Sequence, residues 1–210
     1  MHNRLHYISQ GNTVEEQLYN IHKALDNGCD WIQLRFKKNY SDDAFILAEA
    51  VKMLCKEYLA TFIINDNVHL AKQLDADGVH LGLSDMKVEE ARVLLGKTKI
   101  IGGTANTFDE VLQRTAENCD YIGLGPYQFT TTKQNLSPIL GLEGYRSIIK
   151  QMKTKNIQIP IYAIGGITLE NVESLMETGI YGIAVSGLIT QTENPFQLIN
   201  QLNDNLYGTI

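Results

Sequence analysis

Three hydroxyl side chains and one cation follow an apolar run near the middle of the chain, in the segment 120–133, DYIGLGPYQFTTTK. The apolar run ends at Gly125-Pro126, a pair that ends a strand and begins a loop. Short hydroxyl donors and a mobile ammonium group on a loop suit a phosphate ligand. A solvated threonine-rich loop is the alternative, and this segment alone does not separate the two. The loop residues concerned are Thr130, Thr131, Thr132 and Lys133.

A second group of polar side chains alternates with other residues in the segment 31–37. Gln33, Arg35 and Lys37 are two positions apart, so in a strand all three point to one face. Charges that point into a small barrel are costly unless they reach its mouth and meet a ligand. A polar outer edge is the alternative, and it is disfavoured because helices cover the outer face of parallel strands. We therefore expect these three residues to bind a ligand.

Two carboxylates, Asp66 and Asp85, follow two neighbouring apolar runs. With Asn65 beside them, they offer oxygen ligands to a hard cation. Mg²⁺ typically takes one or two carboxylates and completes its shell with substrate phosphate oxygens. The alternative for each aspartate is the N-cap of the following helix, and for a lone aspartate that is the more common role. The pair together predicts Mg²⁺ as the cofactor.

Glycines mark two later strand ends, in the segments 163–168, AIGGIT, and 184–187, AVSG. Glycines free backbone N–H groups for an anion, and phosphate sites after the seventh and eighth strands recur in barrels. Gly166 and Ser186 therefore predict a second phosphate site. His80 is a possible base, but a histidine in a strand is more often packed and hydrogen-bonded. We expect that structural role for it, and a packing role for Trp31.

Short apolar runs alternate with longer amphipathic segments along the whole chain, and this alternation positions the polar groups. Strands are predicted at 5–9, 31–36, 61–65, 78–81, 99–102, 121–124, 159–164 and 182–185. Helices are predicted at 14–27, 42–58, 87–95, 107–118, 142–153, 169–178 and 195–206. A further short helix is predicted after the third strand and ends at about residue 74. Ser41 or Asp42 is the predicted N-cap of the helix at 42–58.

Eight strand–helix pairs without a linker predict an α/β fold, a single-domain (β/α)8 TIM barrel spanning residues 1–210. An open doubly wound sheet is the alternative. The segment 9–12, SQGN, lacks the GxGxxG turn that would favour it.

The composition bounds the class of protein. Apolar residues make up 44% and charged residues 20%, as in a globular protein with a proper core. The net charge of −6 gives no basic excess to meet nucleic acid or a membrane surface. Cys29, Cys55 and Cys119 are odd in number and widely spaced, which fits reduced thiols. No stretch resembles a signal peptide or a membrane span. We therefore expect a cytoplasmic protein that acts on small molecules.

The predicted polar groups form two anion sites of different character. One is metal-assisted and rich in cations, with Arg35, Lys37 and Lys133, which suits a diphosphate. The other is a mild site of glycines and hydroxyls, which suits a monophosphate. A diphosphate leaving group and a phosphorylated acceptor together predict a group-transfer reaction.

These motifs resemble those of the thiamine phosphate synthase family, from about Trp31 to Gly187. The matching segments are QLRFK at 33–37, IIND at 63–66, DGVHLGLSDM at 77–86, IGGTANT at 101–107, GLGPYQFTTTK at 123–133, AIGGIT at 163–168 and VSG at 185–187. The family's reaction joins an aminopyrimidine methyl diphosphate to a thiazole phosphate, giving thiamine monophosphate and diphosphate. The resemblance implies that reaction here.

The resemblance also assigns roles to residues of this chain. It implies that the pyrimidine diphosphate contacts Gln33, Arg35, Lys37, Asn65, Thr104 and Lys133. It implies Asp66 and Asp85 as Mg²⁺ ligands. It implies Thr130, Thr132, Gly166, Val185 and Ser186 as the thiazole phosphate site, and Thr131 lies within the same loop. Among these, Lys133, Arg35 and Thr104 are the predicted catalytic residues.

The chain departs from the family pattern at five places. Phe36 replaces the usual glutamate, Leu83 a glutamine, Phe129 a proline, and Thr104 a serine whose hydroxyl it keeps. Lys133-Gln134-Asn135 stands where the family usually has K-K-D. We expect Phe36 and Phe129 to alter the pocket wall without removing a metal ligand or a cation.

Two other functions fit the same fold. One is a thiazole tautomerase-like isomerase, which would lack the diphosphate cations and the T-x-T-K loop that this chain has. The other is a non-catalytic phosphate-binding regulator, which would need neither both anion sites nor a pair of metal ligands. The sequence leaves open a homo-oligomer and the carboxylated or plain form of the thiazole.

Overall fold

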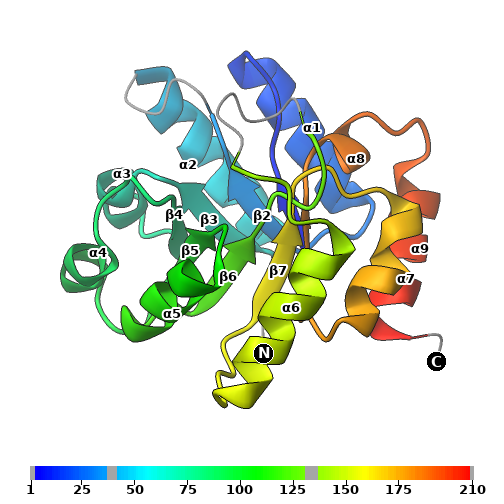
Figure 1. Ribbon diagram of the computed structural model, residues 1–210. Helices are drawn as coiled ribbons and strands as arrows, with labels where there is room; N and C mark the ends of the chain where they lie inside the picture. Colours follow the sequence, from blue (N-terminus) through cyan, green and yellow to red (C-terminus); the bar gives the residue numbers. More distant parts are fainter. Residues whose placement is uncertain (1–2, 37–41, 131–136, 209–210) are drawn as a thin grey trace.

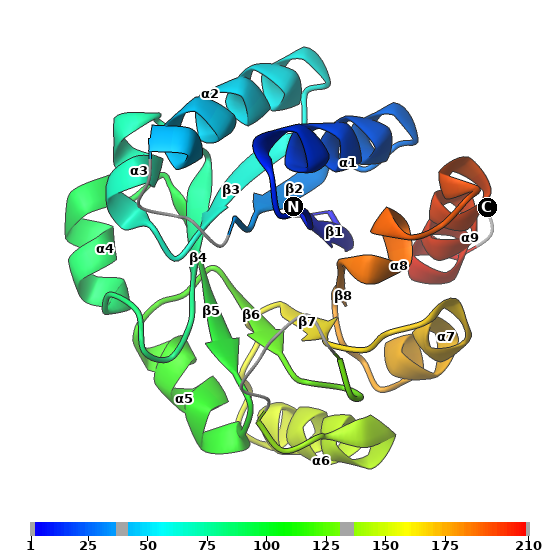
Figure 2. The same cartoon turned by 90° about the horizontal axis from the view of Figure 1, so that it is seen from above.

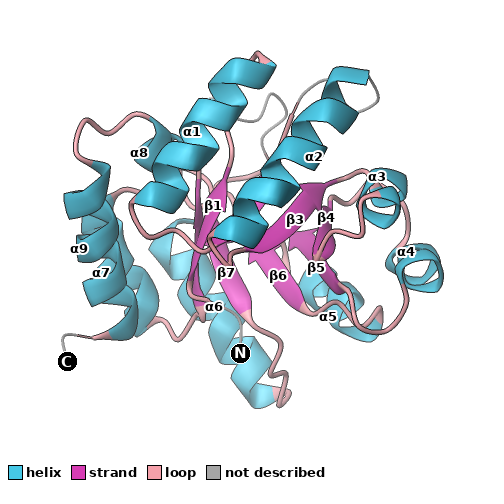
Figure 3. Ribbon diagram, turned by 180° about the vertical axis from the view of Figure 1, so that it is seen from behind, coloured by secondary structure: helices cyan, strands magenta, loops and turns pink. Residues whose placement is uncertain are grey.

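The structure is a computed structural model that describes residues 3–36, 42–130 and 137–208. Its strands form a closed barrel in the order β1 to β8, each parallel to both neighbours. Helices surround the barrel on its outer face, as Figures 1 and 2 show along two perpendicular views, and Figure 3 shows α1 and α2 covering the strands from behind. The predicted (β/α)8 barrel is confirmed.

The elements alternate along the described chain as the sequence predicts. The strands are β1 Leu5–Ile8, β2 Trp31–Leu34, β3 Thr61–Asn65, β4 Gly78–Leu81, β5 Ile100–Ala105, β6 Tyr121–Leu124, β7 Ile161–Ile164 and β8 Gly182–Val185. The helices are α1 Val14–Asp26, α2 Asp42–Glu57, α3 Val68–Gln73, α4 Val88–Leu95, α5 Phe108–Ala116, α6 Gly141–Thr154, α7 Leu169–Glu177, α8 Gly187–Thr190 and α9 Pro195–Tyr207.

Helix starts follow from local chemistry. Thr13 caps α1 by accepting a hydrogen bond from the backbone N–H of Glu16. Thr107 and Glu110 form a reciprocal capping box at the start of α5. Pro195 occupies the first turn of α9, where its missing N–H would have no helical partner. These three helices begin where a side chain accepts from an amide that has no helical partner, or where a proline removes such an amide.

Three strand boundaries differ from the sequence prediction by two residues or more, and one short helix was not predicted. β2 ends two residues early, at Leu34, and β7 begins two residues late, at Ile161, directly after Pro160, which has no N–H for a ladder. β5 runs on to Ala105, so Thr104 lies within the strand and not after it. The short helix α8 was not predicted, because four residues carry no measurable period.

Aromatic side chains fill the barrel interior. Trp31, Tyr121 and Tyr162 belong to one buried cluster with Ile8, Ile63 and Ala184. Trp31 stacks on His6 with ring centroids 4.8 Å apart, and Tyr121 and Tyr162 meet the Trp31 ring edge-on at 5.2 Å and 5.3 Å. The packing role predicted for Trp31 is confirmed. A larger cluster, which includes Leu47, Val51 and Ile64, lies between the sheet and the helices.

The described helices offer no membrane span, since none of them combines the length and the apolar character that crossing a bilayer needs. Cys29, Cys55 and Cys119 are free and buried. Burial raises the pKa of the Cys55 thiol to about 12, which keeps it protonated and unreactive.

Gly102 tests the packing of the barrel interior. A Cβ atom there would lie 2.1 Å from Cζ of the buried Tyr121 ring, which is enclosed by other aromatic rings. We expect Gly102→Ala to lower the free energy of unfolding by about 3 kcal/mol or more, measured by urea denaturation. Gly187→Ala is the control, because its new Cβ would meet nothing closer than 3.5 Å. Equal stability of the two variants would contradict this account of the core.

Candidate active site

A cavity of about 1200 Å³ opens at the carboxyl ends of the strands. Its wall contains every predicted site residue that the structure describes. These are Gln33, Arg35, Asn65, Asp66, Asp85, Thr104, Thr130, Gly166, Val185 and Ser186. Lys37, Thr131, Thr132 and Lys133 lie outside the described residues, so their predicted roles stay predictions. The fold therefore brings together residues that are up to 153 positions apart (Gln33 to Ser186) in one cavity.

The strand β2 supplies two polar groups to this cavity. Gln33 is buried in the strand, and its Nε2 donates to Oδ1 of Asn65 at the end of β3, over 2.7 Å. Arg35 follows the strand and also lines the cavity. Phe36, between Arg35 and the undescribed segment, is buried in the hydrophobic core. Phe36 is not among the described residues that line the cavity, so its effect on the pocket wall stays a prediction.

Asp66 and Asp85 meet across the ends of β3 and β4. Their carboxyl groups share a hydrogen bond. Asp66 has a left-handed backbone, with φ of 63°, and Asp85 accepts a 2.6 Å hydrogen bond from the N–H of Gly82. Neither carboxylate caps a helix: Asn67 is the N-cap of α3 and Lys87 that of α4. The N-cap alternative is therefore wrong for both aspartates.

The electrostatics of Asp66 reflect this crowding. Burial first, and then the neighbouring Asp85, raise the pKa of its carboxyl group from the ordinary 3.8 to about 7, while Arg35 opposes the shift. Two acidic groups facing each other in a partly buried site are unfavourable unless a proton or a cation lies between them. The pair thus has the chemistry of a divalent cation site.

The donor set fits Mg²⁺ better than a metal that a protein encloses completely. No cluster of three or more histidine, cysteine, aspartate or glutamate side chains suited to a metal occurs in the described parts of the chain. Two carboxylates at the mouth of a cavity leave the remaining coordination positions to water and substrate oxygens, which is the usual arrangement for Mg²⁺.

His80 is held between two hydroxyl groups. Its Nδ1 lies 3.0 Å from the Tyr121 hydroxyl, and its Nε2 lies 3.0 Å from Oγ1 of Thr104. The predicted packed and hydrogen-bonded role is confirmed. Thr104 in turn faces the cavity from β5, so the histidine fixes the position of a hydroxyl that lines the site.

The opposite wall of the cavity is made of backbone and small side chains. Gly165 and Gly166 follow β7 with φ of 89° and 71°. A Cβ at Gly166 would come within 2.6 Å of the Phe129 carbonyl oxygen, so only glycine allows the loop after β6 to pack there. On the same wall, at the end of β8, Oγ of Ser186 is buried with no hydrogen-bond partner among the described residues. Such an orphaned donor indicates a polar ligand.

Several lining residues were not predicted as site residues. Leu188 comes from α8, Gln191 and Thr192 follow it, Leu198 comes from α9, and Glu170 comes from the first turn of α7. No motif marks these residues, because their place at the cavity depends on how the helices pack against the barrel. Leu83 and Phe129 also line the cavity and are 45% and 68% exposed, so they flank its mouth. Their effect on substrate stays a prediction.

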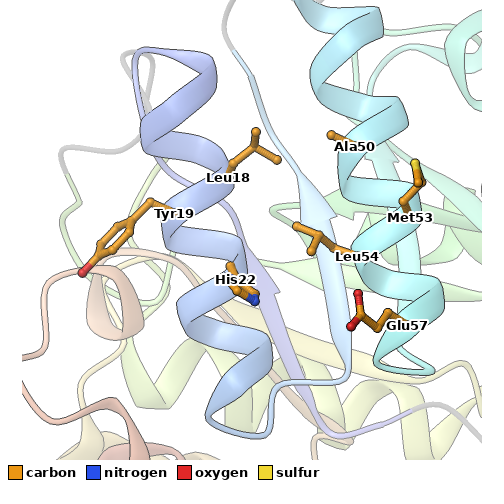
Figure 4. Close-up of a pocket in the computed structure, with 7 residues that line it drawn as sticks. All are labelled: Leu18, Tyr19, His22, Ala50, Met53, Leu54 and Glu57. Atoms are coloured by element: carbon orange, nitrogen blue, oxygen red, sulfur yellow. The ribbon is translucent and has the colours of Figure 1, made fainter.

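A second hollow lies outside the barrel, between α1 and α2 (Figure 4). Its volume is about 480 Å³, and its wall includes Leu18, Tyr19, Met53 and Leu54. None of the described site residues lies there. Apart from Tyr19, its polar lining residues are His22 and Glu57, against the larger polar set of the cavity at the strand ends, so we assign the chemistry to that cavity.

Fold and cavity together define a class of protein: a TIM-barrel enzyme that binds phosphorylated small molecules at the carboxyl ends of its strands. A family model described as thiamine monophosphate synthase matches residues 5–189. The chain therefore belongs to the thiamine monophosphate synthase family, and the predicted function, thiamine phosphate synthesis by a transferase, is confirmed.

Individual relatives agree with this assignment. A thiamine-phosphate synthase of Flavobacterium psychrophilum is 74% identical over 206 residues, which are 98% of this chain and 100% of the relative. One of Flavobacterium johnsoniae is 61% identical and covers 100% of this chain and 99% of its own length. The solved thiamine phosphate pyrophosphorylase of Pyrococcus furiosus superimposes with a TM-score of 0.81 at 30% identity, over 97% of this chain and 95% of its own.

The raised pKa of Asp66 makes a prediction about stability. An unfolded aspartate titrates near 3.8 and the folded one at about 7, so between these values the folded state binds more protons. The folded state therefore loses stability as pH rises through this window. Asp66→Asn removes that loss and keeps the left-handed backbone, which asparagine tolerates. With EDTA present, we expect the Tm of this variant, relative to the parent, to rise from pH 4 to pH 7.

The same series has an internal control. Asp85→Asn removes the neighbouring charge and leaves the burial of Asp66, so we expect the parent's pH dependence to weaken without disappearing. A Tm difference between Asp66→Asn and the parent that does not change with pH would show that Asp66 is ionised throughout.

Proposed function

We propose that this chain catalyses the transfer of an aminopyrimidine methyl group from its diphosphate to the nitrogen of a thiazole phosphate. The observation that supports this most directly is the division of one cavity into two walls. The wall from β2 to β5 carries Arg35, the Asp66–Asp85 pair and Thr104, and the wall from β7 and β8 carries Gly166 and Ser186. The first suits a diphosphate with its metal, and the second suits a monophosphate.

The reaction needs few proton transfers. The bond between the pyrimidine methylene carbon and the diphosphate oxygen breaks, and its electron pair leaves with the diphosphate. The electron-rich aminopyrimidine stabilises the remaining cation, and the thiazole nitrogen supplies the electron pair of the new carbon–nitrogen bond. No general base is required for that bond, in keeping with the hydrogen-bonded role of His80. The protein chiefly positions the reactants and stabilises the leaving charge.

Each described residue of the first wall is proposed to have its own role. Gln33 and Asn65 are hydrogen-bonded to each other over 2.7 Å and form a fixed amide pair that binds the polar edge of the pyrimidine. Arg35 is the described cation of the cavity wall and pairs with the diphosphate. Lys37 and Lys133, outside the described residues, are proposed to add two more cations there. Thr104 donates its hydroxyl to the same group.

Asp66 and Asp85 would hold Mg²⁺, which would neutralise charge on the departing diphosphate. The pair supports this role because its carboxyl groups already face each other, and because neither is used to cap a helix.

The wall from β7 and β8 is proposed to bind the thiazole phosphate. Gly166 offers backbone N–H, Ser186 an orphaned hydroxyl, and Val185 an apolar surface beside them. Thr130, Thr131 and Thr132 belong to the loop after β6, whose described part packs against Gly166. We place the enzyme in the cytoplasm, because the negative chain with its free thiols suits a reducing compartment.

Release of diphosphate in the presence of both substrates tests the proposal directly. We expect release to require the pyrimidine diphosphate, the thiazole phosphate and Mg²⁺ together. Isomerisation of a thiazole without diphosphate release would identify a tautomerase instead, and binding without turnover would identify a regulator.

The metal pair generates its own prediction. We expect Asp85→Asn to abolish Mg²⁺-dependent turnover and to remove the rise in Tm that MgCl₂ produces at pH 8, with an unchanged circular dichroism spectrum. Glu89→Gln on the outer helix α4 is the matched control, because it removes one exposed carboxylate that does not line the cavity. If Asp85→Asn turned over near the parent's rate, Asp66 and Asp85 would not be the metal ligands.

Ser186 generates a prediction about substrate specificity. A hydrogen bond to a charged phosphate contributes about 1.5–3 kcal/mol, which corresponds to roughly tenfold or more in affinity. We expect Ser186→Ala to raise the KM for thiazole phosphate by that factor and to leave the KM for pyrimidine diphosphate nearly unchanged. Ser174→Ala is the control, since its hydroxyl donates only to the Asn171 carbonyl within α7. Equal effects on both KM values would contradict the assignment of one substrate to each wall.

A further inference from the structure

The backbone of Arg35 is held by side chains from two other elements. β2 ends at Leu34, so Arg35 is the first residue beyond the strand. Its N–H donates to Oγ of Ser9 over 2.9 Å, and its carbonyl oxygen accepts from Nε2 of Gln17 over 3.0 Å. Both backbone polar groups of the residue that carries the guanidinium are therefore fixed.

Ser9 extends the pairing of β1 with β2 by one step. Its own N–H donates to the Gln33 carbonyl oxygen over 2.9 Å, and its hydroxyl then accepts from the Arg35 N–H. The side chain takes the place that a backbone carbonyl would hold in a continuing ladder. Ser9 is 1% exposed, so solvent does not compete for this hydrogen bond.

Gln17 fixes the same residue from α1. It is fully buried, and its Nε2 bridges the carbonyl oxygens of Gly11 and Arg35, both at 3.0 Å. Gly11 leads into α1 with φ of 155°, and a Cβ there would lie 2.8 Å from the Gln17 N–H nitrogen. Glycine at this position lets the loop after β1 approach the glutamine.

The glutamine is an unfavourable residue for packing alone. Its Oε1 is buried without a hydrogen-bond partner in the described ranges of the chain, and an unsatisfied buried acceptor destabilises a fold. An apolar side chain of similar size would remove this acceptor, but it would also leave the carbonyl oxygens of Gly11 and Arg35 without their donor. What the glutamine contributes is therefore its amide N–H group, which holds these two carbonyl oxygens in place.

We propose that Ser9 and Gln17 are positioning residues for the diphosphate site. They fix the direction in which the Arg35 side chain enters the cavity, and they touch no substrate themselves. The guanidinium lies at the end of a long side chain, so a small rotation of the Arg35 backbone moves it out of place. Displacements of about 1 Å are enough to impair a binding or catalytic group. This inference rests on the proposed pairing of Arg35 with the diphosphate.

Two single variants test the inference. Ser9→Ala removes one oxygen atom, and Gln17→Met removes the side-chain amide group, both Oε1 and Nε2, at nearly constant volume. We expect each to raise the KM for pyrimidine diphosphate by about threefold to tenfold, and to change the KM for thiazole phosphate by less than about twofold. Thr178→Val is the control: it removes a buried hydroxyl that donates to the Leu175 carbonyl in α7, and both KM values should stay unchanged.

A double-mutant cycle separates positioning from general loosening of the fold. If Ser9 and Gln17 act only through Arg35, adding Ser9→Ala or Gln17→Met to Arg35→Ala should leave the KM for pyrimidine diphosphate within about twofold of Arg35→Ala alone. Fully additive effects would overturn the inference, and so would unchanged KM values in the single variants. If Gln17→Met does not fold, Ser9→Ala carries the same cycle.

The Arg35→Ala variant alone tests the step on which the inference rests. An unchanged KM for pyrimidine diphosphate would remove Arg35 from the diphosphate site and with it both positioning roles. A raised KM, together with additive effects of Ser9→Ala and Gln17→Met, would leave the proposed function intact and overturn only the inference.

Discussion

Closure of the parallel barrel is the constraint on which the rest of the structure depends. Every strand is hydrogen-bonded on both sides, one face is covered by helices, and the other faces a packed interior. Inside the barrel, Trp31, Tyr121 and Tyr162 exclude water from one part of the core. Charged side chains such as Arg35 and Asp66 are tolerated only where the strands end and the cavity opens. Closure thus gathers the polar groups of separate strands in one place.

The site itself is built from groups that do not favour the folded state. Asp66 and Asp85 face each other, and the pKa of Asp66 rises to about 7 because burial and the second carboxyl group disfavour its charge. The hydroxyl of Ser186 and the Oε1 of Gln17 are buried without partners in the described chain. The aromatic and aliphatic core offsets these unfavourable terms. A cation would supply a partner for the two carboxylates, and a phosphorylated substrate would supply one for the Ser186 hydroxyl, so some stability of the folded chain is given up for binding.

Sequence patterns located the strand ends well where a strand is short and bounded by glycine or a charge. β3, β4, β6 and β8 have the predicted bounds, and each brings a site residue to the cavity. The pattern failed at β5, where Gly102-Gly103 looks like a strand end but continues the ladder to Ala105. Gly102 is a glycine because the Tyr121 ring occupies the space of its Cβ, and that ring is distant in sequence. Pairwise packing of this kind leaves no periodic signal.

The sequence by itself determined the β/α rhythm, the family, and the residue types of the site, because hydrophobic period and turn chemistry are local properties. Tertiary structure decided what depends on distant contacts. It buried Phe36 in the core. It left Asp66 and Asp85 outside the helix N-caps, which other residues occupy. It brought Leu188 and Gln191, in and next to α8, to the cavity wall. It also joined Ser9 and Gln17 to the backbone of Arg35. These hydrogen bonds form only when the loop after β1, the start of α1 and the end of β2 meet, and barrel closure brings them together.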